Sequence, residues 1–152
     1  MNSEKLLSWY LGHLRFLYLM YQNCHWQCAG LSFYQDHLLF QRLYEGVLED
    51  VDATAEKIIG VFDTNLVDFK KQCEIVHHIS ENVKLDASIP INLFKNAISA
   101  EDSFLKLSKK LKEILEKEDK LSLGLDDLLA SQANSSEERL YLLKSSLPQS
   151  QE

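Results

Sequence analysis

The sequence predicts an all-α domain, a bundle of four long helices with a long crossover between the second and third helices that contains a short helix. Two observations predict this fold class. Apolar residues recur at steps of three and four through most of the chain, which places them on one face of a helix. Only five Gly and two Pro occur in 152 residues, which is few for a fold with many turns.

Length and composition favour a single globular domain over residues 1–152. A chain of this length buries a real core, and a content of 45% apolar and 26% charged residues excludes a disordered chain. No stretch approaches the roughly 18 uninterrupted apolar residues of a membrane span, and the charged residues near the start exclude a signal peptide. Three cysteines without framework spacing indicate reduced thiols. We therefore expect a cytoplasmic protein with no membrane partner.

The charge balance is acidic, with 23 Asp and Glu against 16 Lys and Arg and a net charge of −7. A net negative surface disfavours unspecific binding to nucleic acid and attracts cations. A run of lysines between residues 106 and 112 is interpreted as a solvated helix face.

Two apolar stripes predict helices over about residues 4–28 and 33–62. Ser3 is the expected N-cap of the first helix, and Gly30 lies in the short turn between the two. Because so few residues separate them, the helices are expected to pack as an antiparallel hairpin. The stripe residues are Leu7, Tyr10, Leu14, Leu17, Tyr21, Cys24 and Cys28 in the first helix, and Tyr44, Leu48, Val51, Ala55, Ile58 and Phe62 in the second.

The second half of the chain predicts two more long helices, over about residues 91–118 and 125–146. Between residues 63 and 90 the pattern weakens, but Leu66, Phe69, Cys73 and Val76 still step by three and four and predict a short helix. Helices joined by short, long and short connections have the connectivity of ferritin-like bundles.

The second helix carries a line of polar groups at steps of three and four: His37, Gln41, Glu45, Glu49, Asp52 and Glu56. A solvated acidic edge is one interpretation of this line. A metal site is the other, because His25 and His37 are equidistant from residue 31 in the turn, so their imidazoles are expected to face each other. Asp52 and Glu56 lie one helical turn apart, which places their carboxylates side by side.

One chain cannot bring all four groups to one ion. His37 and Asp52 are separated by about 22 Å along a helix, whereas metal–ligand bonds measure about 2 Å. Two copies of the helix, antiparallel across a two-fold axis near Tyr44 and Glu45, can do so. Each site then takes two histidines from one subunit and two carboxylates from the other. Such mixed ligands suit iron, manganese or zinc better than calcium.

Further residues of the segment Asn23–Gly60 lie in a characteristic order: His25–Trp26, Gly30, Phe33, His37, Tyr44, and the run from Asp52 to Glu56. This order resembles the signature of the Dps family, the miniferritins or DNA-binding proteins from starved cells. The tail DDLLASQANSSEERLYLLKSSL resembles the last helix of that family, with Tyr141 at an aromatic position. The similarity covers most of the chain and is weak between about residues 63 and 120.

The resemblance implies a ferritin-like bundle assembled into a hollow dodecamer. It implies a ferroxidase centre at the two-fold interface, in which His25 and His37 of one subunit and Asp52 and Glu56 of its partner bind iron and carry the catalysis. Fe(II) would be oxidised there, usually with hydrogen peroxide, and ferric mineral stored in the cavity. Trp26 would either quench stray oxidants beside the centre or pack as an ordinary aromatic residue.

Two departures from the family pattern affect these expectations. Gln41 stands where the family usually has an acid, and an amide is a weaker ligand, so whether a site holds one iron or two stays open. DNA-binding members often carry a tail rich in Lys and Arg, whereas the start MNSEK has one lysine and the other end is acidic. We therefore expect no DNA binding.

Two other functions stay open on the sequence. The first is a structural or DNA-protecting shell with an impaired metal site, and the second is a helical module whose acidic face contacts a basic partner. Cys24 and Cys28 are interpreted as buried structural residues rather than thiolate ligands. By analogy with the family and by charge, Asp126 and Asp127 are expected to line pores that admit Fe(II).

Overall fold

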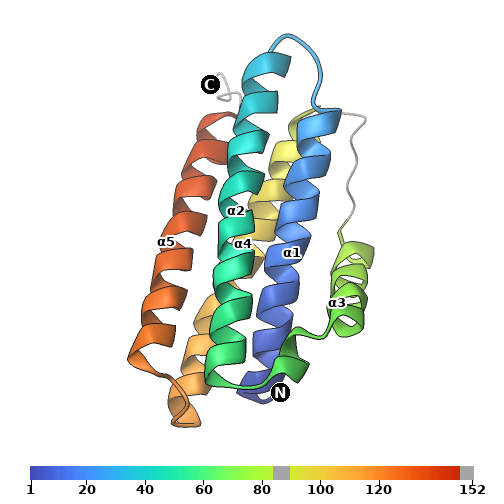
Figure 1. The fold of residues 1–152 in the computed structure, drawn as a ribbon. Helices are drawn as coiled ribbons and strands as arrows, with labels where there is room; N and C mark the ends of the chain where they lie inside the picture. The colour runs from blue at the N-terminus through green and yellow to red at the C-terminus, as the bar shows by residue number, and fades with distance from the viewer. Residues whose placement is uncertain (84–89, 148–152) are drawn as a thin grey trace.

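The computed structural model describes residues 1–83 and 90–147 and confirms the all-α fold class (Figure 1). The bundle consists of α1 (Ser3–Gln27), α2 (Phe33–Val61), α4 (Pro90–Lys117) and α5 (Leu123–Ser145). The connection between α2 and α4 holds a 3-10 turn, η1 (Thr64–Val67), and the predicted short helix, α3 (Phe69–Glu81). Residues 84–89 of this predicted connection lie outside the described residues. Among the described helices, none combines the length and apolarity needed to cross a bilayer.

Helix α1 is central to the arrangement, because it packs against α2, α4 and α3 (Figure 1). Its predicted apolar stripe is buried throughout. The predicted N-cap is wrong by one residue: Asn2 is the cap, and its side-chain oxygen accepts a hydrogen bond from the Lys5 N–H at 3.0 Å. Ser3 is the first helical residue, and its hydroxyl donates instead to Glu118 at 2.5 Å. This bond ties the start of α1 to the segment that follows α4.

The stripe predicted for α2 is displaced by about one position from its buried face. Leu48 is 49% exposed, and Tyr44 and Val51 are only half-buried beside α1. Of the predicted stripe only Ile58 is fully buried, while Tyr44, Val51, Ala55 and Phe62 pack against the core from its edge. Apolar spacing missed the fully buried face in part because Thr54, which hydrogen bonds inside the bundle, interrupts it. That face consists of Asp36, Phe40, Leu43, Val47, Thr54 and Ile58.

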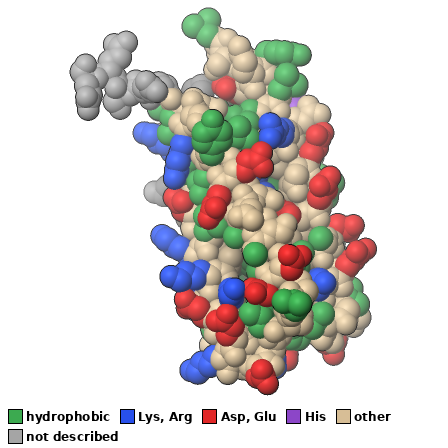
Figure 2. Space-filling view, turned by 90° about the vertical axis from the view of Figure 1, so that its left-hand side faces the viewer, with side chains coloured by type: hydrophobic (Ala, Val, Ile, Leu, Met, Phe, Trp, Pro, Cys, Tyr) green, Lys and Arg blue, Asp and Glu red, His purple; other side chains and the backbone are tan. Residues whose placement is uncertain are grey.

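The exposed faces of α2 and α4 carry mainly charges of opposite sign. Figure 2 looks onto α5 and shows acidic side chains along one edge of this view, whereas basic side chains gather along the opposite edge. Lys106, Lys109 and Lys110 are exposed, as the interpretation of a solvated face requires. Lys112 is half-buried and lies 2.6 Å from Asp126 of α5, so it joins two helices.

Helices α1 and α3 lie in close contact at Gly12. A Cβ atom at this position would collide with Cγ2 of Ile75 and lie 3.1 Å from its Cβ. We expect Gly12→Ala to lower the free energy of unfolding by about 1–3 kcal/mol, the usual range for overpacking. Gly46→Ala is the matched control, since no atom lies within 4 Å of its added Cβ. It should raise stability by up to about 1 kcal/mol by favouring helix. Equal effects in urea denaturation would contradict the close approach.

Candidate metal centre

His25 near the end of α1 and His37 in α2 face each other across the helical hairpin, as their spacing predicted. We call these two residues the His pair. Their ring centroids lie 3.7 Å apart, and the ring planes are inclined by 20°. Nδ1 of His25 lies 2.7 Å from the carbonyl oxygen of His37, and Nδ1 of His37 lies 2.8 Å from the carbonyl oxygen of His25. The two residues therefore hold each other through a reciprocal pair of hydrogen bonds.

These hydrogen bonds assign the tautomer of both rings. A carbonyl oxygen can only accept, so each Nδ1 carries the proton and donates it. In a neutral imidazole the lone pair then lies on Nε2, the second ring nitrogen. Metal-binding histidines almost always donate their other ring N–H to a carbonyl or carboxylate in this way, which fixes the orientation of the ring. The His pair therefore has the chemistry of two prepared nitrogen ligands.

Aromatic residues bracket the His pair on both sides. Phe33 stacks on His37 with ring centroids 5.1 Å apart, and Tyr44 meets His25 edge-on at 5.4 Å. These contacts restrict rotation of the imidazole rings. Trp26 is 65% exposed, so within one chain it is not a packed aromatic residue.

Asp52 and Glu56, the carboxylate pair, lie one turn apart on the exposed edge of α2, beyond its midpoint. They do not meet the His pair in one chain. Within residues 1–83 and 90–147, no group of three or more His, Cys, Asp or Glu side chains could hold a metal ion. One chain thus carries an imidazole half-site and a carboxylate half-site at different levels of the same helix.

Gln41 and Glu45 lie between the two half-sites and bind each other. Nε2 of Gln41 donates to Oε1 of Glu45 at 2.9 Å. The amide oxygen of Gln41 is neutral, so a negative charge one turn after His37 is missing. A cation at that position would therefore be bound more weakly by Gln41 than by the carboxylate of an acidic residue.

The remaining candidate residues are the cysteines near the end of α1 and the predicted pore acids of α5. Cys24 and Cys28 are buried, as interpreted, and burial raises the pKa of the Cys24 thiol to about 12. A protonated thiol in the core is a poor metal ligand.

Asp126 is paired with Lys112, which neutralises much of its charge, whereas Asp127 is exposed. Their role in a pore stays a prediction.

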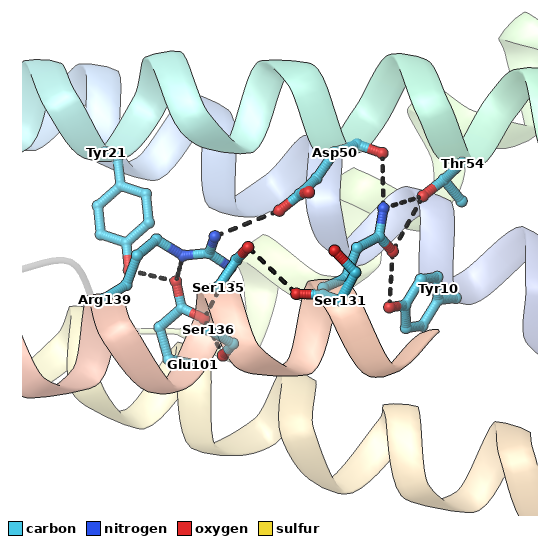
Figure 3. Close-up of polar contacts among 10 residues, drawn as sticks. Tyr10, Tyr21, Asp50, Thr54, Glu101, Ser131, Ser135, Ser136 and Arg139 are labelled. Atoms are coloured by element: carbon cyan, nitrogen blue, oxygen red, sulfur yellow. Dashed lines mark hydrogen bonds and ion pairs between the residues drawn. The ribbon is translucent and has the colours of Figure 1, made fainter. Parts of the chain in front are cut away.

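The interior of the bundle holds a polar network that the sequence analysis missed (Figure 3). Glu101 of α4 is fully buried and accepts hydrogen bonds at 2.5 Å from the hydroxyls of Tyr21 and Ser136 and from Nε of Arg139. Arg139 also lies 3.3 Å from Asp50. All four bundle helices contribute to this network. The available signal was the position of Glu101 on the apolar face of α4, between Ala97 and Phe104.

A second part of the network lies around Gln132 of α5. Its amide oxygen accepts a hydrogen bond from the hydroxyl of Tyr10 at 2.8 Å (Figure 3). Its amide nitrogen donates to the hydroxyl of Thr54 at 2.8 Å and to the backbone carbonyl oxygen of Asp50 at 3.1 Å. Burial raises the pKa of Tyr10 well above its ordinary value. These groups satisfy one another, so the network is structural.

Four long helices, a short–long–short pattern of connections and a short helix in the crossover define a ferritin-like bundle. The family model named Ferritin, described as a ferritin-like domain, matches residues 4–148. The chain therefore belongs to the ferritin-like domain family. In many bundles of this class, carboxylates and histidines on facing helices hold metal in the core. Here the guanidinium of Arg139 lies in the core beside Glu101, which leaves the His pair as the candidate centre.

Solved structures of Dps proteins share the fold of this chain. Dps from Thermosynechococcus elongatus superposes with a TM-score of 0.78 at 19% identity, over 97% of this chain and 90% of that one. A Listeria innocua Dps mutant gives 0.81 at 16% identity, over 95% of each chain. Dps from Vibrio cholerae, described as a member of a broad superfamily of ferritin-like diiron-carboxylate proteins, gives 0.75 at 15% identity, over 94% and 87%. The resemblance to Dps proteins is thus confirmed at the level of the fold.

One curated relative matches part of the chain. A stretch of 56 residues is 44% identical to an uncharacterized protein in the bpoA2 5' region of Kitasatospora aureofaciens. The match covers 37% of this chain and 37% of that protein, so the chain aligns with little more than a third of its relative.

Proposed function

We propose that this protein oxidises Fe(II) at sites shared between two copies of the chain and stores the ferric product inside a hollow homo-oligomer. The observation that carries the proposal is the reciprocal hydrogen bonding of the His pair, which prepares two Nε2 atoms for a cation. The carboxylate pair on the same helix supplies the complementary half. Membership in the ferritin-like family supports iron as the metal.

Each group has a role in this proposal. The Nε2 atoms of His25 and His37 bind Fe(II), and Asp52 and Glu56 of the partner subunit neutralise its charge. Hydrogen peroxide takes one electron from each of two Fe(II) ions and two protons from solvent, and its oxygen–oxygen bond breaks to give two water molecules. Because Gln41 contributes no charge, each site is proposed to hold one of these two iron ions firmly and the other loosely.

The assembly is proposed to be a dodecamer like that implied by the Dps resemblance. Large apolar side chains stay exposed along α1 and α2 of the single chain, among them Trp26, Leu19 and Leu48. Exposed apolar surface of this kind marks an interaction face. With a net charge of −7 on each chain, the shell is not expected to bind DNA. We place its activity in the cytoplasm.

The test is iron loading followed by separation according to size. The protein is given Fe(II) without oxygen and then limiting hydrogen peroxide, and iron is quantified in the protein peak after size-exclusion chromatography. Iron that elutes with a large assembly, well beyond two ions per chain, supports storage. An assembly that elutes without iron contradicts it and favours the alternative that Gln41 motivates, a structural or DNA-protecting shell. A gel-shift assay at physiological salt then tests the DNA part of that alternative.

A further inference from the structure

A groove of about 420 Å³ lies on the surface between α1, α2 and α3. We call it the α3 groove. Its walls are mainly apolar and include Leu19, Leu48, Val51 and Val76, of which Leu19 is 50% and Leu48 is 49% exposed. Apolar surface of this extent is costly to leave in water, so the groove is a candidate contact surface.

Two polar side chains in the α3 groove have atoms without partners. The Nε–H of Arg15 is buried and donates to no acceptor within the described part of the chain, and Oε1 of Gln72 is buried and accepts from no donor there. None of the ion pairs among residues 1–83 and 90–147 includes the guanidinium of Arg15. Buried polar groups are almost always hydrogen bonded. The groove therefore presents a positive charge that lacks its counterpart.

The register of the helical hairpin places Arg15 along α2. The His pair is equidistant from residue 31, and so are Tyr18 and Tyr44, whose ring centroids lie 6.0 Å apart. By the same rule Arg15 lies level with Val47. Leu48 and Val51, which share the groove with Arg15, agree with this register.

The proposed two-fold axis, between positions 44 and 45, brings Arg42 of the partner subunit to the level of Val47 and therefore of Arg15. Arg42 pairs with Glu138 of its own α5, so it is not a counterpart for Arg15. The nearest acid along the helix is Glu45 of the partner subunit, which the axis places level with Tyr44, three positions from the level of Arg15. Three positions correspond to about 4.5 Å along the helix, a distance that an arginine side chain spans. Glu45 is exposed and uses one carboxylate oxygen to accept from Gln41, which leaves the other oxygen for a second donor.

We propose that a second copy of this chain closes the α3 groove and that Arg15 pairs there with Glu45 of the partner subunit. Two such ion pairs, related by the two-fold axis, set the register in which the His pair meets Asp52 and Glu56 of the partner subunit. This inference rests on the shared site of the proposed function. It adds the contact that aligns the two chains, outside the metal ligands themselves.

The test is a charge-reversal cycle on the full-length protein. Arg15→Glu and Glu45→Arg are each expected to place like charges together and to weaken the dimer at least about a hundredfold. The combined variant Arg15→Glu/Glu45→Arg restores opposite charges and should recover assembly. Native mass is measured over a range of protein concentrations at low salt, and circular dichroism verifies the helical content of each variant. Lys106→Glu, which reverses an exposed charge on α4, is the matched control and should leave the mass unchanged.

The outcomes separate this inference from the proposed function. If both single variants assemble like the wild type, or if the combined variant is no better than either, the ion pair is wrong. If the cycle behaves as expected but no variant, including the wild type, oxidises Fe(II), the ion pair stands and the function fails. A wild-type chain that stays monomeric at every concentration overturns the second copy as the occupant of the groove.

Discussion

Mixing two inactive variants should restore Fe(II) oxidation, because each supplies the half-site that the other lacks. His25→Ala/His37→Ala keeps the carboxylate pair, and Asp52→Ala/Glu56→Ala keeps the His pair. When the two are unfolded and refolded together, about half of the two-fold pairs contain one chain of each kind, and each such pair has one complete site of two. About a quarter of the wild-type activity is therefore expected. The initial rate of Fe(II) oxidation with hydrogen peroxide measures it.

The design separates a shared site from a site within one chain. Each variant refolded alone should be inactive. A variant that lacks all four ligands, mixed with either of the others, provides no complete site and serves as the control for refolding. If the mixture forms shells of normal size but oxidises no iron, the two half-sites do not meet. Activity in either variant alone would show that its missing pair is dispensable.

The geometry of the His pair could be predicted from sequence because it depends only on a short turn between two helices. Positions equidistant from such a turn lie opposite each other, whatever the rest of the protein does. The bounds of the four long helices were also predictable from apolar periodicity, to within two residues at every end. The meeting of Asp52 with His37 depends on a second copy of the chain, so neither the sequence nor one protomer can establish it.

The buried face of α2 could not be predicted from apolar spacing, because polar residues share it. Thr54 is buried through its bonds to Gln132, and Asp50 lies inward because Arg139 meets it. Meanwhile Leu48 faces outward, where we propose that a second subunit covers it. Periodicity measures which residues avoid water in the final assembly, and it cannot distinguish a core from an interface. The Glu101–Arg139 pair was missed for a different reason, because its partners lie on different helices and periodicity describes one helix at a time.

Replacing Arg139 by Met should strongly destabilise the bundle. The guanidinium is buried and donates to both oxygens of Glu101, at 2.5 and 3.2 Å. Removing one partner of a buried ion pair leaves an uncompensated charge, at a cost of about 3–5 kcal/mol. The midpoint of urea denaturation at fixed protein concentration, followed by circular dichroism, measures the loss. Arg42→Met is the control, because its ion pair with Glu138 is exposed and contributes at most about 1 kcal/mol.

The stability lost in Arg139→Met should also depend on pH, because Asp50 titrates beside Arg139. Burial raises the pKa of Asp50, and Arg139 opposes that rise. Without the guanidinium, the pKa of Asp50 in the folded variant should rise further above its unfolded value. A carboxyl whose pKa is higher in the folded state than in the unfolded state binds its proton more tightly when the protein is folded. Its contribution to stability is complete below its pKa in the unfolded chain, about 3.9. The contribution is lost as the pH rises through its pKa in the folded state. The deficit of Arg139→Met should therefore be larger at pH 7 than at pH 5.

A second substitution tests whether charge or shape causes the loss. In Glu101→Gln/Arg139→Met the carboxylate becomes a neutral amide. Tyr21 and Ser136 donate to different oxygens of Glu101, so the amide oxygen can still accept from one of these hydroxyls while the amide NH2 donates to the other. If the cost comes from an unpaired buried charge, the double variant should be more stable than Arg139→Met alone, although it departs further from the wild type. If it is equally unstable, the lost packing of the arginine side chain is responsible. Recovery would mean that Arg139 stabilises the bundle by compensating the buried charge of Glu101, which also occupies the carboxylate that a metal ion in the core would need.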